Sequence, residues 1–562
     1  MSAMWTLVSR LNAASGDLVA AKRARNAAVL SEAKQALIGY VAAQAGKGGN
    51  YPEPDPGALP CPETPAGYSS TTGTDGKSQG TCGLMVGRFP WRTIGTAKLV
   101  DADGEPLWYV VASGWTKPSS GAPVINSNCT SSATLPCSTG RLTVDAVPRA
   151  AAALIIAPGA AFNAAAAAGC SARNQLRPTT GTPDLRNYLE CENASSPADA
   201  VFVTSGPAGS FNDQVMKVSG EELLLAIEAA IARRIEIDIA PGVRSAYSGG
   251  AWPAAPALPF AVPFADPTTS PFKGAAGTFQ GLLPLVFAET APGSGLPCAS
   301  GNRCDPLFVA WTGGSLSGTN LYATSCSVGT TTFTTLQCTY YFRARLDQSD
   351  LPRYENFTLS ATARNAGMAL RQLNPSTALA NVNTTGRTAT GVLNGDGSAT
   401  ITLGASARAS ASGSWDANAS CGLAPADPLY GCQHALLQVP IWLLQDHPLL
   451  DPNDATYGWF LRNRWHEAAY YAVAPGIAPS GARSCTTSVS CLRVAFHPSD
   501  GKQRGLIVLA GYSLAGAARP NGTLADWLEG ANALAGSRFT LREPALQTNR
   551  AFNDRIAVLD SN

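Results

Sequence analysis

The side chains that most often carry catalysis are sparse in this chain of 562 residues, and none belongs to a complete catalytic motif; Ser31-Glu32-Ala33-Lys34 has the S-x-x-K spacing but no companion motif. His466-Glu467 lacks the second histidine of a zinc-protease helix, and Gly511-Tyr512-Ser513-Leu514-Ala515 departs at its last position from the serine turn of α/β-hydrolases. No glycine-rich phosphate loop is present. The sequence therefore predicts a protein that is not an enzyme and that carries no organic cofactor.

One carboxylate cluster has the composition of a cation site. Asp101, Asp103 and Glu105 surround a glycine in a short turn, and calcium prefers clustered carboxylate oxygens. The remaining ligands of a twelve-residue EF-hand loop are missing. Two interpretations stay open here: a solvated turn, and a loop that a bound calcium ion stabilises.

The fourteen cysteines form no C-x-x-C motif, so zinc ribbons and thioredoxin-like sites have no support. Many lie beside turn residues, and neighbours in the sequence are close enough to be joined by local disulfides. Because disulfides persist in oxidising compartments, the cysteines predict a periplasmic or cell-surface protein; free thiols in the cytosol are the alternative. The expected pairs are Cys61 with Cys82, Cys129 with Cys137, Cys170 with Cys191, Cys298 with Cys304, Cys326 with Cys338, Cys421 with Cys432, and Cys485 with Cys491.

Composition limits the partners and the fold. The 40 Lys and Arg residues nearly balance the 39 Asp and Glu residues, which leaves a net charge of +1 and no electrostatic argument for nucleic acid. The 55 glycines and 40 prolines indicate many turns, and the 45% of hydrophobic residues are enough to fill cores. At this length we expect two to four domains with much β-structure.

The element that organises the N-terminal region is a helix predicted over residues 5–45. This stretch contains no proline, carries an apolar stripe and ends at a glycine-rich segment. A helix of this length reaches about 60 Å, which is more than a compact domain needs. We therefore expect residues 1–48 to form a stalk that packs against other helices, and we expect a head to fold without residues 1–44. The residues assigned to this packing are Leu7, Leu11, Leu18, Leu30, Leu37 and Val41.

An internal repeat organises the rest of the chain. A second helix is predicted over residues 221–231. The aromatic run 107–112 then resembles 469–474, and the strand 154–159 resembles 506–511, so Tyr109 and Tyr471 should face equivalent cores. Two further landmarks keep the same order: Tyr188-Leu189-Glu190 with Phe211-Asn212-Asp213 returns as Trp527-Leu528-Glu529 with Phe552-Asn553-Asp554.

The second copy is longer because a β-rich segment interrupts it. Period-two alternation and the hairpin signal Asn394-Gly395-Asp396-Gly397 predict a separate sandwich-like domain. The predicted fold class is α+β, with a long N-terminal helix, two helix-plus-antiparallel-sheet modules in tandem and an inserted all-β domain. The expected boundaries are 1–48 for the stalk, 49–218 for the first module, 219–297 with 425–562 for the second module, and 298–424 for the insertion.

The end of the long helix, Ala33-Lys34-Gln35-Ala36-Leu37-Ile38-Gly39-Tyr40, followed by Leu59-Pro60-Cys61-Pro62, resembles the prepilin-type family of bacteria, which includes type IV pilins and type II secretion pseudopilins. Residues 87–95 and 103–110 are similar to the block after the stalk in large members. The resemblance covers residues 20–240 and, through the repeat, parts of 420–562. It implies pilin-like modules and a non-enzymatic structural subunit, whose large head suits a minor subunit at the tip of a fibre.

That resemblance also implies partners and a location. Other pilin or pseudopilin subunits would pack against the stalk helix. The leader peptide and apolar half-helix of the family are not in this chain, and we expect a segment upstream that anchors the protein in the inner membrane. Two other functions stay open: a surface adhesin or carbohydrate- or partner-binding protein that uses the inserted β-domain, and a secreted hydrolase.

Overall fold

The computed structural model of the chain is a mixed α+β protein with one long N-terminal helix and several antiparallel sheets, as the sequence predicts. For residues 2–15, 164, 245–248 and 560–561, and for the strands between residues 309 and 440, it describes the backbone alone. The other described residues are 16–47, 56–63, 73–116, 124–161, 163, 166–167, 170–177, 184–195, 200–207, 209–244, 258–270, 272, 274–285, 455–478, 481, 484–487, 489–495, 497, 501–514, 516–534, 536, 538–540 and 552–559.

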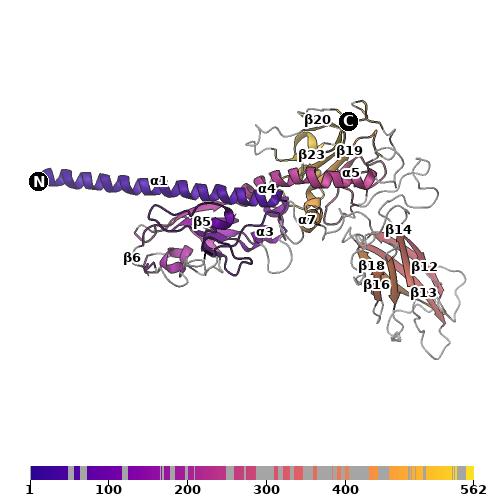
Figure 1. The fold of residues 1–562 in the computed structure, drawn as a ribbon, viewed down its shortest axis with the longest axis horizontal. Helices are drawn as coiled ribbons and strands as arrows, with labels where there is room; N and C mark the ends of the chain where they lie inside the picture. The colour runs from indigo at the N-terminus through magenta and orange to yellow at the C-terminus, as the bar shows by residue number, and fades with distance from the viewer. Residues whose placement is uncertain are drawn as a thin grey trace.

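Helix α1 (Ser2–Gly46) forms because the segment is rich in alanine and contains no proline. Its C-terminal half packs on the head, and the buried residues recur every three or four positions, as expected of one helix face. Its N-terminal half projects away from the rest of the molecule (Figure 1). The buried residues are Asn26, Leu30, Ala33, Leu37, Val41 and Ala45.

The first sheet has the strand order β1-β2-β5-β9, with antiparallel neighbours throughout. Every residue of the two interior strands is buried, because α1 and the loops of the head cover the sheet. The bounds are β1 (Val86–Arg88), β2 (Trp108–Val111), β5 (Ala153–Ala157) and β9 (Gln214–Val218).

A second long helical segment follows β9. Ser219 and Glu222 form a capping box that starts α4 (Gly220–Arg234), and α4 continues through a π turn (Ile235–Ile239) into α5 (Ala240–Ser248). The N–H of Ala240 donates to the carbonyl of Ile235, one residue beyond the usual α-helical partner. Pro241, which has no N–H, follows directly, so the wider turn accommodates it without breaking the helix.

The second sheet has the order β10-β19-β21-β23 and packs against this helical segment. Its register repeats that of the first sheet. Tyr109 lies opposite Gly87 and Ile155, and Tyr471 lies opposite Gly281 and Ile507. Both tyrosines are fully buried, so they occupy equivalent positions in two equivalent sheets. The bounds are β10 (Gln280–Leu282), β19 (Ala469–Val473), β21 (Gln503–Leu509) and β23 (Arg555–Ser561).

The inserted strands form two further antiparallel sheets, β11-β14-β17-β16 and β12-β13-β18-β15. The hairpin predicted around residues 394–397 is formed by β16 and β17. Because β18 pairs with β13 along its whole length, the inserted sheets extend to Pro440, beyond the boundary expected at residue 424. The bounds are β11 (Val309–Gly313), β12 (Asn320–Val328), β13 (Thr335–Arg345), β14 (Thr358–Ala363), β15 (Val382–Asn383), β16 (Ala389–Leu393), β17 (Ala399–Leu403) and β18 (Tyr430–Pro440).

Short elements connect these sheets. The smaller sheets are β4-β3-β8, β6-β7 and the parallel pair β20-β22. They comprise β3 (Leu142–Val144), β4 (Val147–Ala151), β6 (Asn163–Ala164), β7 (Arg173–Asn174), β8 (Val201–Phe202), β20 (Arg493–Ala495) and β22 (Arg538–Thr540). The short helices are α2 (Trp91–Ile94), η2 (Ser113–Trp115), η3 (Ser127–Thr130), α3 (Pro136–Thr139), η4 (Leu185–Asn187), η5 (Cys191–Ala194), α7 (Gly458–Arg462), η8 (Trp465–Ala468), η9 (Leu524–Asp526) and η10 (Gly530–Ala533).

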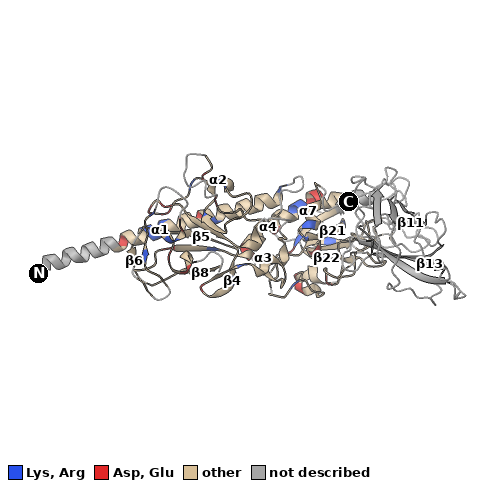
Figure 2. Ribbon diagram, turned by 90° about the horizontal axis from the view of Figure 1, so that it is seen from below, with Lys and Arg blue, Asp and Glu red and all other residues tan. Residues whose placement is uncertain are grey.

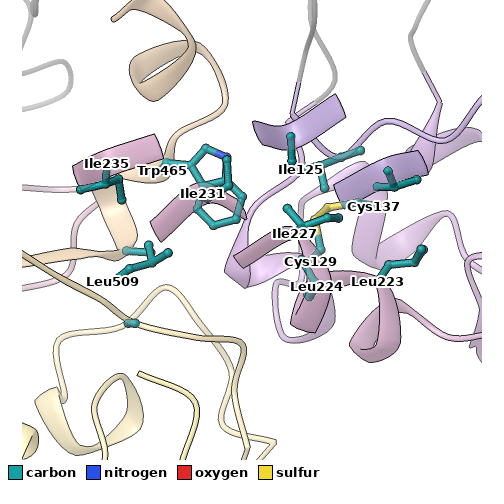
Figure 3. Close-up of a cluster of buried hydrophobic side chains, with 14 of the residues drawn as sticks. Ile125, Cys129, Cys137, Leu223, Leu224, Ile227, Ile231, Ile235, Trp465 and Leu509 are labelled. Carbon is teal, nitrogen blue, oxygen red and sulfur yellow. A yellow bond between two sulfur atoms is a disulfide. The ribbon is translucent and has the colours of Figure 1, made fainter. Parts of the chain in front are cut away.

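Helix α4 joins the two sheets into one core. On one side Leu223, Leu224 and Ile227 meet the loop closed by Cys129 and Cys137 (Figure 3). On the other side Ile231 and Ile235 lie toward Trp465 and Leu509 of the second half. This helical segment therefore contributes buried residues to both halves, while Leu225 and Ile237 on its outer face stay exposed.

Candidate functional site

The feature that sets this molecule apart from a compact globular protein is the projecting part of α1. Residues 16–21 and 23–25 are exposed, whereas burial begins at Asn26. Leu18 is 60% exposed and Val19 is 50% exposed, and the two lie next to each other on the part of the helix that the head does not cover. Arg23 and Arg25 lie beside them on the exposed helix. The projecting part therefore combines apolar and cationic side chains on an accessible surface.

The head holds the helix rigidly where it emerges. Lys22 forms an ion pair with Asp103, and Asn26 Oδ1 accepts a hydrogen bond of 2.6 Å from the N–H of Ala102. Further along, Lys34 Nζ donates to Glu222 over 2.6 Å and to the carbonyl of Lys217 over 2.9 Å. These contacts fix the direction in which α1 leaves the head.

The turn from Asp101 to Glu105, considered above as a calcium loop, is part of this attachment. Asp101 is fully buried; its Oδ1 accepts the N–H groups of Asp103 (2.8 Å) and Glu105 (2.9 Å), and its Oδ2 accepts that of Gly159 (2.8 Å). The Glu105 carboxylate lies 3.8 Å from Arg177. Backbone N–H groups and two basic side chains thus face all three carboxylates.

More generally, no group of three or more His, Cys, Asp or Glu side chains among the described residues is placed to hold a metal ion. Similarly, none of the described helices is both long enough and apolar enough to cross a membrane.

The structure divides the residues assigned to helix packing. Leu18 is exposed and available, but Leu30, Leu37 and Val41 are buried in the head. Those three are core residues, because they lie on the face of α1 that covers the first sheet, and they cannot contact another subunit. For the same reason residues 1–44 are not a detachable stalk. Leu7 and Leu11 lie among the residues for which only the helical backbone is described.

Disulfides brace the loops of both halves. Four of the expected pairs are joined: Cys61–Cys82, Cys129–Cys137, Cys170–Cys191 and Cys485–Cys491. Each closes a loop of its own half, which is the local pairing that the sequence predicts.

The three pairs expected in the inserted segment stay predictions. The strand register places Cys326 opposite Cys338, in agreement with a fifth bridge, although only the backbone is described there. Cys304 lies outside the described residues, as do its expected partner Cys298 and also Cys421. Cys432 lies in β18 opposite Arg343 of β13, at a position described by its backbone alone.

Two of the four histidines lie among the residues whose side chains are described. His466 is buried between the rings of Phe272 and Phe460, and burial lowers its pKa to about 3. His497 Nδ1 lies 3.1 Å from Gln503 Nε2. His434 lies in β18 with backbone alone, and His447 lies outside the described residues.

Sequence reasoning missed two buried carboxylate pairs. In the first acid pair, Glu190 Oε2 accepts the N–H groups of Asn212 (3.1 Å) and Asp213 (3.0 Å). Asp213 Oδ2 in turn accepts the N–H of Glu190 (3.1 Å) and the side-chain amide of Asn193 (2.9 Å). Each carboxylate thus binds the backbone of the other residue, and together they join η5 to the start of β9.

The second acid pair repeats this arrangement. Glu529 Oε2 accepts the N–H groups of Asn553 (3.1 Å) and Asp554 (3.2 Å). Asp554 Oδ2 accepts the N–H of Glu529 (2.9 Å) and the side-chain amide of Asn532 (3.0 Å). This pair joins η10 to the start of β23. The internal repeat aligns these residues as landmarks, and the recurrence of a glutamate and an Asn-Asp dipeptide is the signal that could have predicted the contact.

An arginine and an aromatic ring accompany each pair. Arg177 lies 4.6 Å from the ring centre of Tyr188 and donates to the carbonyl of Gly159 over 2.9 Å. Arg519 lies 5.0 Å from the ring centre of Trp527 and donates to the carbonyl of Gly511. Because the two glycines end equivalent strands, this is one hydrogen-bonded cluster built twice. Its duplication favours a structural role over a catalytic one.

Comparisons with protein-family models, with curated proteins and with solved structures find no match to this chain.

Proposed function

We propose that this chain is a non-enzymatic structural subunit of an extracytoplasmic fibre, of the pilin or pseudopilin kind, and that it assembles through the projecting part of α1. The observation that carries the proposal is the exposure of Leu18 and Val19 on a helix that the head holds rigidly but leaves uncovered. Apolar side chains that project in this way are stabilised when a partner helix covers them. The resemblance of the helix and the following block to prepilin-type proteins supports the same assignment.

The arrangement of the two sheets supports a terminal position in such a fibre. The first sheet lies along α1, and the second sheet lies beyond the C-terminal end of α1, away from the N-terminus (Figure 1). The helical segment of the second sheet packs against α1 and the core of both halves, with Leu225 and Ile237 exposed on its outer face, and it does not project from the head as α1 does. A subunit with one projecting helix and a head that extends beyond the other end of that helix can cap a fibre. A subunit that repeats along the fibre must instead leave space for neighbouring subunits above and below it.

The disulfides support an oxidising location. Four bridges close loops of both halves, and such bonds are rare in cytosolic proteins. We therefore place the protein in the periplasm or on the cell surface. Acidic and basic side chains are interspersed along the described part of the molecule (Figure 2), so its charge gives no reason to propose nucleic acid as a partner.

Site-specific crosslinking tests the assembly role. A photoreactive amino acid in place of Leu18 or Val19 should form crosslinks, in cells of the source organism, to the N-terminal helix of another fibre subunit. The matched control is Val489, which is 81% exposed on the head and should give none of these products. Crosslinks at position 18 that match those at position 489, or no crosslinks at either site, would remove the basis of the proposal.

The inserted sheets support a second function. Among the described residues, strands β11 to β18 pair only with one another, so they form a separate unit that could bind a surface ligand. Deleting residues 298–440 should abolish adhesion in the adhesin interpretation while leaving crosslinks through Leu18 intact.

A further inference from the structure

The acid pairs contain one oxygen each that the protein leaves without a donor. Asp213 Oδ2 accepts two hydrogen bonds, whereas Asp213 Oδ1 is buried and has no partner among the described residues. Asp554 shows the same division between Oδ2 and Oδ1. A buried carboxylate oxygen without a hydrogen bond is costly, so the same unpaired atom in both halves requires an explanation.

The neighbouring glutamate explains why this aspartate oxygen has no donor. Glu190 and Asp213 each accept the backbone N–H of the other, which brings their carboxyl groups side by side, and Glu529 and Asp554 do the same. Burial, and then the charge of the adjacent glutamate, raise the pKa of Asp213 and of Asp554 well above its ordinary value. Two carboxylates this close cannot both be ionised at low cost, whereas one proton between them converts the repulsion into a hydrogen bond.

We propose that Asp213 and Asp554 are protonated in the folded protein and that each donates a hydrogen bond from Oδ1 to its partner glutamate, so that a shared proton fastens the last strand of each sheet. The proton resides on the aspartate because each glutamate already accepts two backbone N–H groups, which favour its ionised form. On release the proton passes to solvent, and two adjacent charges remain.

The charges around the pairs agree with this assignment. Near the first pair, Gln175 Nε2 donates to Glu190, and Arg177 donates to the oxygen of that same amide over 3.1 Å. Arg88 lies on the ring of Tyr188 beside them. Near the second pair, Arg519 faces Glu529 and Asp554, and also Glu228 and Asp526. One negative charge on the glutamate is therefore stabilised by Arg519 at the second pair and by the amide of Gln175 at the first.

The consequence is that the two carboxyl–carboxylate hydrogen bonds are lost at high pH. An aspartate in an unfolded chain loses its proton at about pH 4, so above that pH the folded state binds one more proton at each pair. Stability from the shared protons is therefore full in acid and declines as the pH rises to the raised pKa of the aspartate. Beyond that point the start of β9 and the start of β23 lose their attachment to η5 and η10.

The test replaces each aspartate by its neutral analogue. In Asp213→Asn and Asp554→Asn the amide N–H₂ takes the place of the donating O–H, and the amide oxygen keeps the two donors. The melting temperature of the wild-type protein should fall with rising pH. In each variant this slope should be smaller by roughly 3–5 °C per pH unit, as expected for a folded unit of about 150–250 residues. Asp17→Asn, on the exposed part of α1, is the control and should leave the profile unchanged.

A second measurement uses the unaltered protein. Infrared spectra at pH 7 should contain the band of protonated carboxyl groups, and its intensity should fall in each aspartate variant but not in Asp17→Asn. A wild-type spectrum without this band overturns the proposal, as does a variant whose pH profile keeps the wild-type slope. Loss of stability on chelation of divalent cations would also overturn it, because a cation would then occupy the place of the proton.

Discussion

At the scale of single residues, Glu228 carries a carboxyl group in a fully buried position. It lies on α4 between the two halves, and Ser127 and the backbone of Tyr512 lie near its carboxylate. Burial raises its pKa to about 8, although Arg555 and Arg519 act in the opposite direction. The side chain is therefore neutral in the folded protein at neutral pH and charged in the unfolded chain.

Glu228→Gln should remove a pH dependence. With the folded pKa above the unfolded value of 4.5, the wild-type protein loses about 1.4 kcal/mol of stability per pH unit as the pH rises from 4.5 to about 8. The glutamine variant lacks this component and should be the more stable protein at pH 8. Urea unfolding followed by tryptophan fluorescence at several pH values measures the difference. Equal slopes would show that Glu228 is solvated in the native state.

His466 predicts the opposite behaviour in acid. Burial lowers the pKa of His466 to about 3 in the folded protein. Between about pH 6.5 and pH 3, His466 is therefore protonated in the unfolded chain and neutral in the folded protein. As the pH falls from 6.5 to about 3, this histidine lowers the free energy of unfolding by about 1.4 kcal/mol per pH unit. His466→Phe should abolish that component while keeping an aromatic ring against Phe272 and Phe460. Unfolding curves between pH 3 and pH 7 test it, and an unchanged acid slope would contradict it.

At the scale of elements, close approach decides which glycines matter. A Cβ at Gly281 in β10 would lie 1.7 Å from the carbonyl oxygen of Val262, so this edge strand can pair with β19 only if the position is glycine. Gly39, in the half of α1 that packs on the head, has nothing within 4 Å of the place that a methyl group would take. The two positions therefore make a matched comparison.

Gly281→Ala should destabilise the protein by more than about 2 kcal/mol, since backbone must move to admit the methyl group. Gly39→Ala should stabilise it by up to about 1 kcal/mol, because alanine is the better helix former. Thermal unfolding of both variants checks the two signs. A neutral Gly281→Ala protein would show that β10 lies farther from Val262 than this packing requires.

At the scale of the whole molecule, α1 has two parts with different roles. Removing residues 1–21 takes away only the exposed part and should leave the melting temperature of the head unchanged within a degree or two, while crosslinking to fibre subunits is lost. Removing residues 1–44 also takes away Leu30, Leu37 and Val41 from the core, and that chain should fail to fold. Circular dichroism and limited proteolysis distinguish the two products. A stable head without residues 1–44 would contradict the shared core.

Sequence by itself determined the features that depend on local order. The absence of proline predicted α1, the spacing of cysteines predicted four bridges that the structure contains, and matched apolar runs placed Tyr109 and Tyr471 at equivalent positions. These succeed because helix formation, short-loop closure and strand alternation are set by neighbours along the chain.

Tertiary structure alone decided which face of α1 is covered and which carboxylates meet. Leu18 and Leu37 have the same character in the sequence, but the first sheet buries only Leu37. Glu190 and Asp213 are 23 positions apart, and Glu529 and Asp554 are 25 positions apart, so only the return of the last strand to each sheet brings the members of a pair together. Burial and proximity across the fold then set their ionisation, and no pattern of neighbours encodes either quantity.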